Sequence, residues 1–352
     1  MFVVQKKILV AMSGGVDSSA AAVLLQRQGH AVVGATMRLT ADSRGAEEDA
    51  RRVAEHLGIE HHVLDFREAF AREVTEPFVR EYLSGRTPNP CVRCNRFLKF
   101  GALLEAGLSL GCTHMATGHY ARVEYVDDRY RLIYDPENPK DQSYFLYRLT
   151  QEQLSRTIFP LTGMSKKALR QIAAEAGLPV AGKGDSQDIC FIPGGNYKAY
   201  LRAHPEVDGA AETGDFVDTE GRVLGRHSGI WSYTVGQRKG IGIAAAQPYY
   251  VLGLDPERRQ VILGTESELY RSEVWLEDVH WISGVTPAAG TELTAKTRYA
   301  GTPVSVELRE KTARKQAVYF SEPIRAATPG QSLVFYAGHE VLGGGIISTQ
   351  AP

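Results

Sequence analysis

The sequence predicts an α/β N-terminal domain with a parallel sheet, then a small β-rich central domain and a C-terminal antiparallel β-barrel. From about residue 6 to 117, apolar strand-like runs alternate with helical stretches, which is typical of a parallel sheet covered on both faces. Beyond about residue 200, short runs rich in Val, Tyr, Thr and Gly recur between turns without another long helix. A polar break at residues 264–268 divides that part in two. We therefore expect domains at residues 1–200, 201–268 and 269–352.

The composition is that of a globular protein with more than one domain. The chain has 352 residues, of which 43% are hydrophobic and 23% charged, so it is too long for one average domain. The formal net charge of -1 means that any binding of nucleic acid depends on local basic patches. The start lacks the pattern of a signal peptide, and no run approaches the ~18 apolar residues of a membrane span, so we expect a cytoplasmic protein without a membrane partner.

The first motif is the stretch Ser13-Gly14-Gly15-Val16-Asp17-Ser18-Ser19. A run suited to a buried strand precedes it (Lys7 to Met12), and a helix-forming run follows it (Ala20 to Gln28). Two glycines permit a sharp turn, and the free N–H groups and dipole of the helix attract an anion. No Lys-Ser or Lys-Thr pair follows, so this is not a Walker loop, and the serine hydroxyls suit a pyrophosphate. The alternative is an ordinary serine-capped helix after a tight turn.

The elements that follow place further candidates at one edge of the sheet. We expect strands at 31–37, 61–66 and 113–117 and helices at 46–57, 68–83 and 164–176. Met37 ends its strand beside the glycine turn, where it either lies against an adenine or packs in the core. Gly118 lets a nucleotide pass close to the backbone, and His119 either faces the opening or is structural. In the stretch 140–142, a cation, an acid and an amide either contact RNA or include a helix cap at Asp141.

The second motif is Asn89-Pro90-Cys91-Val92-Arg93-Cys94-Asn95. Asn89 is a good helix cap and Pro90 a good first helical residue, so we expect Cys91 in the first turn and Cys94 one turn further on. The helix N-terminus, together with Arg93 and Arg96, favours thiolate character. Cys190 lies in a polar loop that contains glycine and runs into an apolar segment.

Three interpretations compete for the cysteines. Structural zinc would need Cys112 or a histidine as its fourth ligand, since only one close pair is present. Independent buried thiols explain Cys112 well and a Cys-x-x-Cys pair poorly. A redox or sulfur-handling trio of Cys91, Cys94 and Cys190 fits best, because four cysteines are too few for a disulfide scaffold.

The glycine stretch resembles the SGGxDS loop of the N-type ATP pyrophosphatases, which adenylate an oxygen and release pyrophosphate. Over nearly the whole chain, a series of stretches in order resembles the bacterial tRNA-specific 2-thiouridylases, which thiolate the wobble uridine of certain tRNAs. These stretches are SGGVDSS, TPNPCVRCN, ATGHY, KDQSYFLY, DSQDICFI, GQRKG, KTRY and TPGQS. The resemblance implies that the N-terminal domain has the adenine nucleotide alpha hydrolase-like, PP-loop fold.

The same resemblance implies roles for individual residues. ATP would be held by Ala11, Met12, Ser13, Gly14, Gly15, Val16, Asp17, Ser18, Met37 and Gly118, with Asp17 holding Mg2+ on the leaving pyrophosphate. Cys94 would be the nucleophile, and Cys190 would receive a persulfide sulfur. The target base would lie against Asn89, Pro90 and Cys91. The implied tRNA contacts are His119, Lys140, Asp141, Gln142, Arg298, Tyr299 and Gln331.

One departure from the family concerns Cys91, because many members carry Asp there. An acid–base role of that Asp does not transfer to this chain. Three thiols at Cys91, Cys94 and Cys190 also suit a 4Fe-4S cluster with one open iron, which is the alternative to a persulfide.

The predicted function is ATP-dependent 2-thiolation of the wobble uridine U34 of tRNA. Adenylation of the C2 oxygen would make it a leaving group, and sulfur from a persulfide or from cluster-bound hydrosulfide would displace AMP. The expected partners are tRNA and a sulfur-donor protein that carries a persulfide, and not DNA. The alternatives are another N-type ATP pyrophosphatase that forms an amide, which would need no cysteine trio, and a non-catalytic RNA-binding protein.

Overall fold

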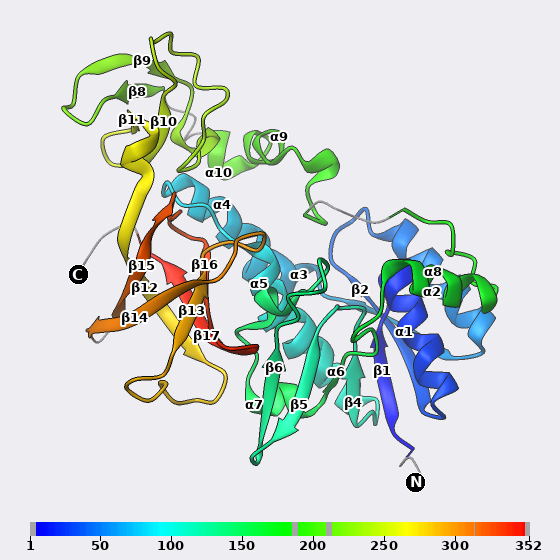
Figure 1. The fold of residues 1–352 in the computed structure, drawn as a ribbon. Coiled ribbons are helices and arrows are strands. Elements are labelled where there is room, and N and C mark those ends of the chain that lie inside the picture. Colours follow the sequence, from blue (N-terminus) through cyan, green and yellow to red (C-terminus); the bar gives the residue numbers. More distant parts are fainter. Residues whose placement is uncertain (1–4, 185–188, 209–212, 313, 349–352) are drawn as a thin grey trace.

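The computed structural model describes residues 5–184, 189–208, 213–312 and 314–348 (Figure 1). Its N-terminal part holds a five-stranded parallel sheet of strand order β3-β2-β1-β4-β7. The strands are β1 (Lys7–Ala11), β2 (Ala31–Arg38), β3 (Glu60–Asp65), β4 (His114–Ala116) and β7 (Thr157–Ile158). Leu9 in β1 belongs to one hydrophobic cluster, whereas Ile8 and Val10 belong to another, so both faces of the sheet are buried.

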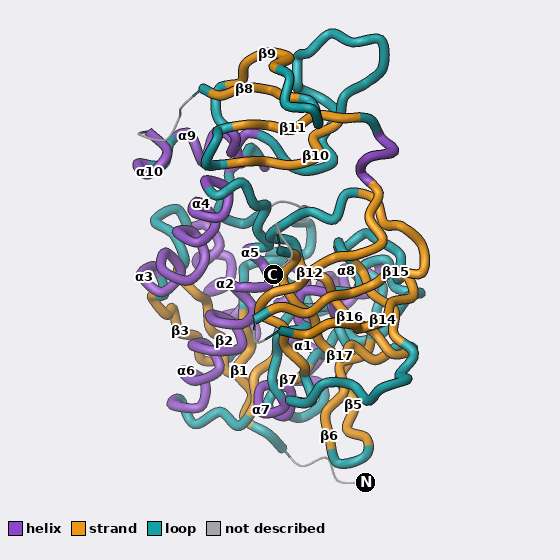
Figure 2. The backbone as a smooth tube through the Cα atoms, turned by 90° about the vertical axis from the view of Figure 1, so that its left-hand side faces the viewer, coloured by secondary structure: helices purple, strands orange, loops and turns teal. Residues whose placement is uncertain are grey.

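Helices cover both faces of this sheet (Figure 2). On the face of Ile8 and Val10 lie α1 (Val16–Arg27), α2 (Arg44–Leu57) and α8 (Lys166–Glu175). On the face of Leu9 lie the π-helix η2 (Cys94–Leu103), α6 (Leu104–Ser109) and α7 (Gln151–Ser155). The short α5 (Pro90–Arg93) leads directly into η2, and the 3-10 helix η3 (Ser143–Leu146) packs in the same cluster as η2.

A third hydrophobic cluster surrounds the start of η2. It joins Cys94 and Leu98 to the helical stretch that follows β3 and to the segment after Cys190. That stretch consists of α3 (Arg67–Phe70), the π-helix η1 (Ala71–Thr75) and α4 (Glu76–Leu83). The later segment holds η4 (Pro193–Gly195), α9 (Tyr197–Arg202) and α10 (Pro205–Asp208). Edge-to-face contacts of Phe191 with Phe70 and Phe78 hold the two together.

The central domain is a small four-stranded sheet of order β10-β11-β8-β9, seen at the top of Figure 2. Its strands are β8 (Gly214–Val217), β9 (Val223–His227), β10 (Tyr250–Asp255) and β11 (Gln260–Gly264). The 3-10 helices η5 (Ile230–Ser232) and η6 (Glu266–Leu269) follow β9 and β11. β8 and β11 pair in parallel, and the other pairs are antiparallel.

The C-terminal part is a closed antiparallel barrel. Its strands are β12 (Tyr270–Trp281), β13 (Leu293–Lys296), β14 (Val304–Lys311), β15 (Lys315–Arg325), β16 (Ser332–Ala337) and β17 (Glu340–Ile347). They follow the order β12-β15-β14-β13-β16-β17, and pairing of β12 with β17 closes the ring. Closure removes the exposed strand edges.

A hairpin from the N-terminal part extends the barrel sheet. β5 (Arg122–Val126) and β6 (Arg129–Ile133) are joined at Asp127 and Asp128, which both have positive φ, as a two-residue hairpin turn requires. β6 pairs with β17, and Glu340 of β17 bonds to Arg129. The sequence analysis did not predict this hairpin, although residues 122–125 and 129–132 each alternate polar and apolar side chains around the Asp127-Asp128 turn.

The barrel also contacts the loop that leads to the cysteine helix α5. The Thr87 N–H donates to the Pro329 carbonyl at 2.8 Å, and the Gln331 side-chain amide donates to the carbonyls of Thr87 and Pro88 at 2.9 and 3.2 Å. Gly330 has a φ of +89°, and a Cβ there would lie 2.9 Å from the Thr87 backbone. The close approach therefore requires glycine at this position.

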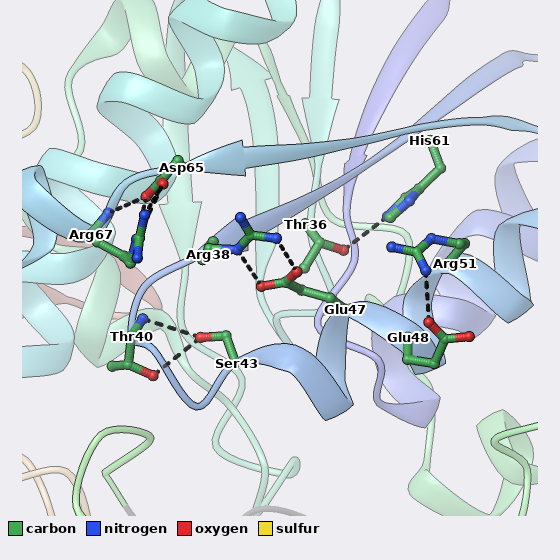
Figure 3. A network of polar contacts seen from close by, with 10 residues as sticks. All are labelled: Thr36, Arg38, Thr40, Ser43, Glu47, Glu48, Arg51, His61, Asp65 and Arg67. Atoms are coloured by element: carbon green, nitrogen blue, oxygen red, sulfur yellow. Dashed lines mark hydrogen bonds and ion pairs between the residues drawn. The ribbon is translucent and has the colours of Figure 1, made fainter.

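A polar network fixes α2 against the end of β2 (Figure 3). Arg38 donates two hydrogen bonds to the buried Glu47 of α2, at 2.9 and 2.6 Å. Such a bidentate pair fixes the orientation of the two side chains and is stronger than a single hydrogen bond. The Thr36 hydroxyl donates to the Met12 carbonyl at 2.9 Å and also contacts His61. The network holds β1, β2 and α2 in place around the glycine turn.

The predicted fold class is confirmed by this architecture. The strands and helices expected before residue 180 are present within a few residues of the predicted bounds, although η1 interrupts the helix expected at 68–83. The helix after the glycine turn begins at Val16 and not at Ala20. Of the helices in the described residues, none has both the length and the apolar character needed to cross a bilayer.

We predict that Gly330→Ala destabilises the protein more than Gly290→Ala does. Gly290 has a similar φ of +83°, but a Cβ there would meet nothing within 4 Å, so its substitution costs only the left-handed strain of about 1 kcal/mol. At Gly330 the collision with Thr87 adds about 1–3 kcal/mol. Urea unfolding of both variants measures the difference, and equal losses would contradict a tight contact between barrel and cysteine loop.

Candidate active site

The glycine turn between β1 and α1 is held open by its own serines. The Ser13 N–H donates to Ser18 Oγ at 3.1 Å, and the Ser18 and Ser19 hydroxyls donate to the Gly15 carbonyl. Gly14 has a φ of +67°, and a Cβ there would collide with the Ala46 carbonyl of α2. The first-turn N–H groups of α1 and the Ser13 hydroxyl are therefore suited to binding an anion.

The end of β4 lies directly against this turn. A Cβ at Gly118 would lie 2.9 Å from the backbone nitrogen of Ser18. Met37, beyond the last β1–β2 pair, is half-buried and packs against two hydrophobic clusters. The structure thus brings together the glycine turn and Gly118, whereas the packing of Met37 supports the core alternative.

Two lysines that the sequence analysis missed bind the glycine turn. Lys166 forms an ion pair with Asp17 at 2.7 Å, and Tyr120 donates to the same carboxylate oxygen at 3.1 Å. Lys183 donates to the Gly14 carbonyl at 3.0 Å and to Asp49 at 2.6 Å. The available signal was the Ser165 helix cap, whose hydroxyl accepts from the Ala168 N–H, because that cap places Lys166 in a first turn. Phosphates at the turn would therefore meet cations as well as N–H groups.

The two cysteines of the second motif lie at the start of one continuous helix. Asn89 occupies the N-cap position of α5, but its side chain makes no capping bond, so the predicted cap is wrong in that respect. Cys91 is exposed and Cys94 is buried. From Cys94 the helix continues as the π-helix η2, in which hydrogen bonds run between residues five apart. Residues five apart are therefore neighbours on one face, which places Lys99 beside Cys94.

Lys99 is the cation common to the three thiols. Burial raises the pKa of Cys94 to about 11, and the Lys99 charge opposes that shift. Burial also raises the pKa of Cys91 and of Cys190, and Lys99 again is the cation that opposes it. The negative charge that Cys190 would carry also acts on Cys91 and Cys94, so the three thiols lie within electrostatic range of one another.

This environment corrects the predicted thiolate character. Desolvation outweighs the helix N-terminus, so the thiols are protonated near neutral pH. Arg93 and Arg96 do not supply the expected charge, because they point to Glu73 and Asp278. The Cys112 thiol is buried in the core beneath the sheet, as its sequence context predicts.

His119 connects Lys99 to the glycine turn. Its Nε2 lies 3.4 Å from Lys99 Nζ, and its Nδ1 lies 2.7 Å from the Thr117 hydroxyl. Burial holds the pKa of His119 well below its usual range, so the ring is neutral. Because an ammonium only donates, we assign Nε2 as the acceptor and Nδ1 as the N–H donor to Thr117. Because Gly118 approaches Ser18 closely, contacts run from the turn through His119 to Lys99, whose charge acts on the thiols.

Known protein families and relatives match nearly the whole length of this chain. A family model described as tRNA methyl transferase HUP domain matches residues 6–194, one described as tRNA methyl transferase PRC-barrel domain matches residues 206–265, and one described as aminomethyltransferase beta-barrel domain matches residues 271–347. A relative from Acidithiobacillus ferrooxidans named tRNA-specific 2-thiouridylase MnmA is 49% identical over 97% of this chain and 98% of its own length. A relative of the same name from Clostridium botulinum is 44% identical over 99% of each chain. The chain belongs to the tRNA-specific 2-thiouridylase family.

Solved structures resemble about half of the chain. The U34-tRNA thiolase NcsA from Methanococcus maripaludis with its 4Fe-4S cluster has 20% identity and a TM-score of 0.34, over 50% of this chain and 58% of its own. A 4-thiouridine synthetase in complex with RNA and ATP has 17% identity and a TM-score of 0.34, over 51% and 43%. Membership of the 2-thiouridylase family confirms the family expected from the motifs, and with it an enzyme of the tRNA-uridine 2-sulfurtransferase class.

The arrangement of Cys91, Cys94 and Cys190 determines whether these thiols could hold a metal centre. Among the described residues, no three His, Cys, Asp or Glu side chains converge as a metal ion would require. Cys91 and Cys190 reach the surface while Cys94 faces the hydrophobic cluster around Phe70. The arrangement as described therefore does not form the three-cysteine site that a 4Fe-4S cluster would need. Residues 185–188 of the DSQDICFI stretch lie outside the described residues.

The candidate tRNA contacts of the KDQ stretch are only partly exposed. Asp141 is buried, and its carboxylate accepts bonds from the N–H groups of Asp135 and Ser143, which is a structural role. The N-cap of η3 is Gln142, so Asp141 is not the helix cap that the alternative predicted. The Gln142 side chain accepts from the Tyr120 N–H at 3.0 Å. Lys140 is exposed.

The candidate tRNA contacts in the barrel also differ in their exposure. Arg298 is exposed, whereas the half-buried Tyr299 packs against Phe145 with ring centroids 4.7 Å apart. Gln331 holds the backbone of Thr87 and Pro88, just before Asn89 and Pro90. These contacts make Asp141, Tyr299 and Gln331 suited to positioning the site, while Lys140 and Arg298 are exposed at the surface.

We predict that alkylation of Cys94 in the ligand-free enzyme increases about tenfold per pH unit between pH 7 and 10, because only the thiolate reacts and its pKa is about 11. Mass spectrometry of the peptide after timed exposure to iodoacetamide measures the rate. Lys99→Met should lower the rate at pH 8 by about three- to tenfold, since one pKa unit is a tenfold change in thiolate. Lys99→Arg should restore most of it. A rate that is already constant at pH 7 would contradict a protonated thiol.

Proposed function

We propose that this chain thiolates C2 of the wobble uridine U34 of tRNA, with ATP as the activating substrate. The observation that carries the proposal is the series of contacts from Ser18 through His119 to Lys99, the cation whose charge acts on all three thiols. It links an anion-binding turn to a group of three cysteines within one site. The family of the chain and the names of its relatives support tRNA as the substrate.

The first step activates a poor electrophile. The C2 oxygen of the uridine attacks the α-phosphate of ATP, pyrophosphate leaves, and the oxygen becomes part of an adenylate. The glycine turn, Lys166 and Lys183 would stabilise the charge on the departing pyrophosphate. Mg2+ suits this place, because it is commonly held by one carboxylate, here Asp17, together with substrate phosphates.

The second step transfers sulfur from a persulfide. With the sulfane sulfur on Cys190, the Cys94 thiolate attacks the Cys190 sulfur, and a Cys94–Cys190 disulfide forms as hydrosulfide leaves. Hydrosulfide then adds to C2 and displaces AMP, which gives 2-thiouridine. An external thiol must supply two electrons to reduce the disulfide. Lys99 would stabilise the Cys94 thiolate and the departing hydrosulfide.

The exposure of individual side chains supports a sulfur-donor protein and tRNA as partners. Cys190 is exposed, so a sulfur-donor protein that carries a persulfide could reach it. The target base must leave the anticodon stack to reach Cys91 and its neighbours, which requires unpaired RNA and contacts at a distance. Lys140 and Arg298 are exposed side chains suited to such contacts.

We predict that Cys190→Ser abolishes 2-thiouridine formation but retains pyrophosphate release from ATP in the presence of tRNA. The matched control is Cys112→Ala, which removes a thiol of the core and should retain thiolation. Nucleoside analysis of the tRNA and a pyrophosphate assay measure the two steps separately.

Three outcomes would contradict parts of this proposal. Full thiolation by Cys190→Ser would remove Cys190 from sulfur transfer, and an amide-forming pyrophosphatase would not depend on this residue at all. Absence of pyrophosphate release from the wild type with tRNA would favour a non-catalytic RNA-binding protein. Iron and sulfide in anaerobically purified active protein would replace the persulfide by a cluster.

A further inference from the structure

A small cavity lies behind the cysteine helix, between that helix and the barrel. Its volume is about 60 Å³, which is room for a few water-sized groups. Its wall includes three arginines, Arg93, Arg96 and Arg148, and two rings, Phe97 and Tyr147. Asn89 and Ser332 also line it, so it adjoins the loop held by the barrel. The mechanism above uses none of these arginines.

The positive charge in this cavity exceeds the negative charge that faces it. Arg148 and Arg96 share the carboxylate of Asp278, at 2.7 and 3.9 Å. Arg93 lies 3.7 Å from Glu73, which also pairs with Arg72. Glu81 is on the wall as well, but Arg86 binds it at 2.6 Å.

Both signs of charge act on these arginines. Burial lowers the pKa of Arg93, the charges of Glu73 and Glu81 oppose that shift, and the charge of Arg148 adds to it. Burial also lowers the pKa of Arg96, where the charge of Arg148 adds to the shift and that of Asp278 opposes it. Arg148 therefore repels the other two guanidinium groups across the cavity. A bound anion would remove that repulsion.

One of the three guanidinium groups is incompletely bonded. The Arg148 side chain is 6% exposed, and its Nε has no hydrogen-bond partner within the described part of the chain. A buried donor of a charged group without a partner costs free energy that a bound acceptor would recover. The side chain also lies over the Tyr147 ring, 5.8 Å from its centroid.

An irregularity in β12 fixes the position of Arg148. Asp278, its partner, has a φ of +50° and lies where β12 shifts from pairing with β15 to pairing with β17. The irregularity turns the Asp278 carboxylate and carbonyl toward Arg148. Arg93 and Arg96 both lie over the Phe97 ring, which limits their motion.

We propose that this cavity binds a phosphodiester group of the RNA strand that carries the target base. This inference rests on the proposed function. Arginine in a fixed fork suits phosphate oxygens, and the side chains of Arg93 and Arg96 are 38% and 37% exposed, so a strand on the surface can reach them. The Asn89 wall places the anion beside the loop suggested for the base, where a held phosphate would keep the flipped nucleotide in register.

The test compares Arg96→Gln with Arg51→Gln. Arg51 is an arginine of α2 with similar exposure and its own acidic partner, Glu48, and it lies outside the site. Binding of unmodified tRNA to the full chain, carrying Cys94→Ser to prevent turnover, is measured by filter binding at several salt concentrations. We expect Arg96→Gln to weaken binding about three- to thirtyfold and to reduce the slope of log affinity against log salt by about one. Arg51→Gln should change neither.

Each outcome decides the inference. An unchanged affinity and salt slope for Arg96→Gln would overturn it. So would protection of Arg96 and Arg148 from arginine-modifying reagents by inorganic phosphate but not by tRNA, which would indicate a small-anion site. If the parent chain binds no tRNA at all, the proposed function fails. If the parent binds tRNA and the wild-type chain thiolates it while Arg96→Gln is silent in the binding assay, only this inference fails.

Discussion

The contact between Lys99 and His119 is the constraint on which the site depends. It exists because the helix that starts with the cysteines becomes a π-helix at Cys94. In an α-helix, at 3.6 residues per turn, Lys99 would be rotated by about 140° from Cys94. Its side chain would then point away from the thiols. The wider helix is held by packing on two sides, because Leu98 and Phe100 are both buried but belong to different hydrophobic clusters.

Burial raises the pKa of the cysteine thiols, whereas the charge of Lys99 lowers it. Burial keeps the thiols protonated, which limits their reaction with oxidants as well as with substrates. One lysine beside them lowers the cost of forming a thiolate without removing that protection. Arg93 and Arg96 are nearer to the cysteines in the sequence, yet they do not serve this purpose, because their guanidinium groups pair with Glu73 and Asp278.

The sheet and the glycine turn could be predicted because their signals are local. The alternation of Ile8, Leu9 and Val10 between two faces and the Gly14-Gly15 pair each determine their own structure. The contributions of Lys166 and Lys183 could not be predicted, because they reach the turn from more than 140 residues away in the chain. The π-helix also has no local signal, since its sequence is as suited to an ordinary helix. The domain boundaries remain predictions.

The barrel does more than add a surface to the catalytic domain. Gln331 and Pro329 bond to the backbone before Asn89, and Gly330 permits the close approach. The hairpin β5–β6 starts two residues after Tyr120, which donates to Asp17, and it continues the sheet of the barrel. The barrel is thus joined to the cysteine loop at one end and to the glycine turn at the other. A domain joined at both places fixes the distance between the glycine turn and the cysteines, which is the quantity that the proposed two-step transfer must control.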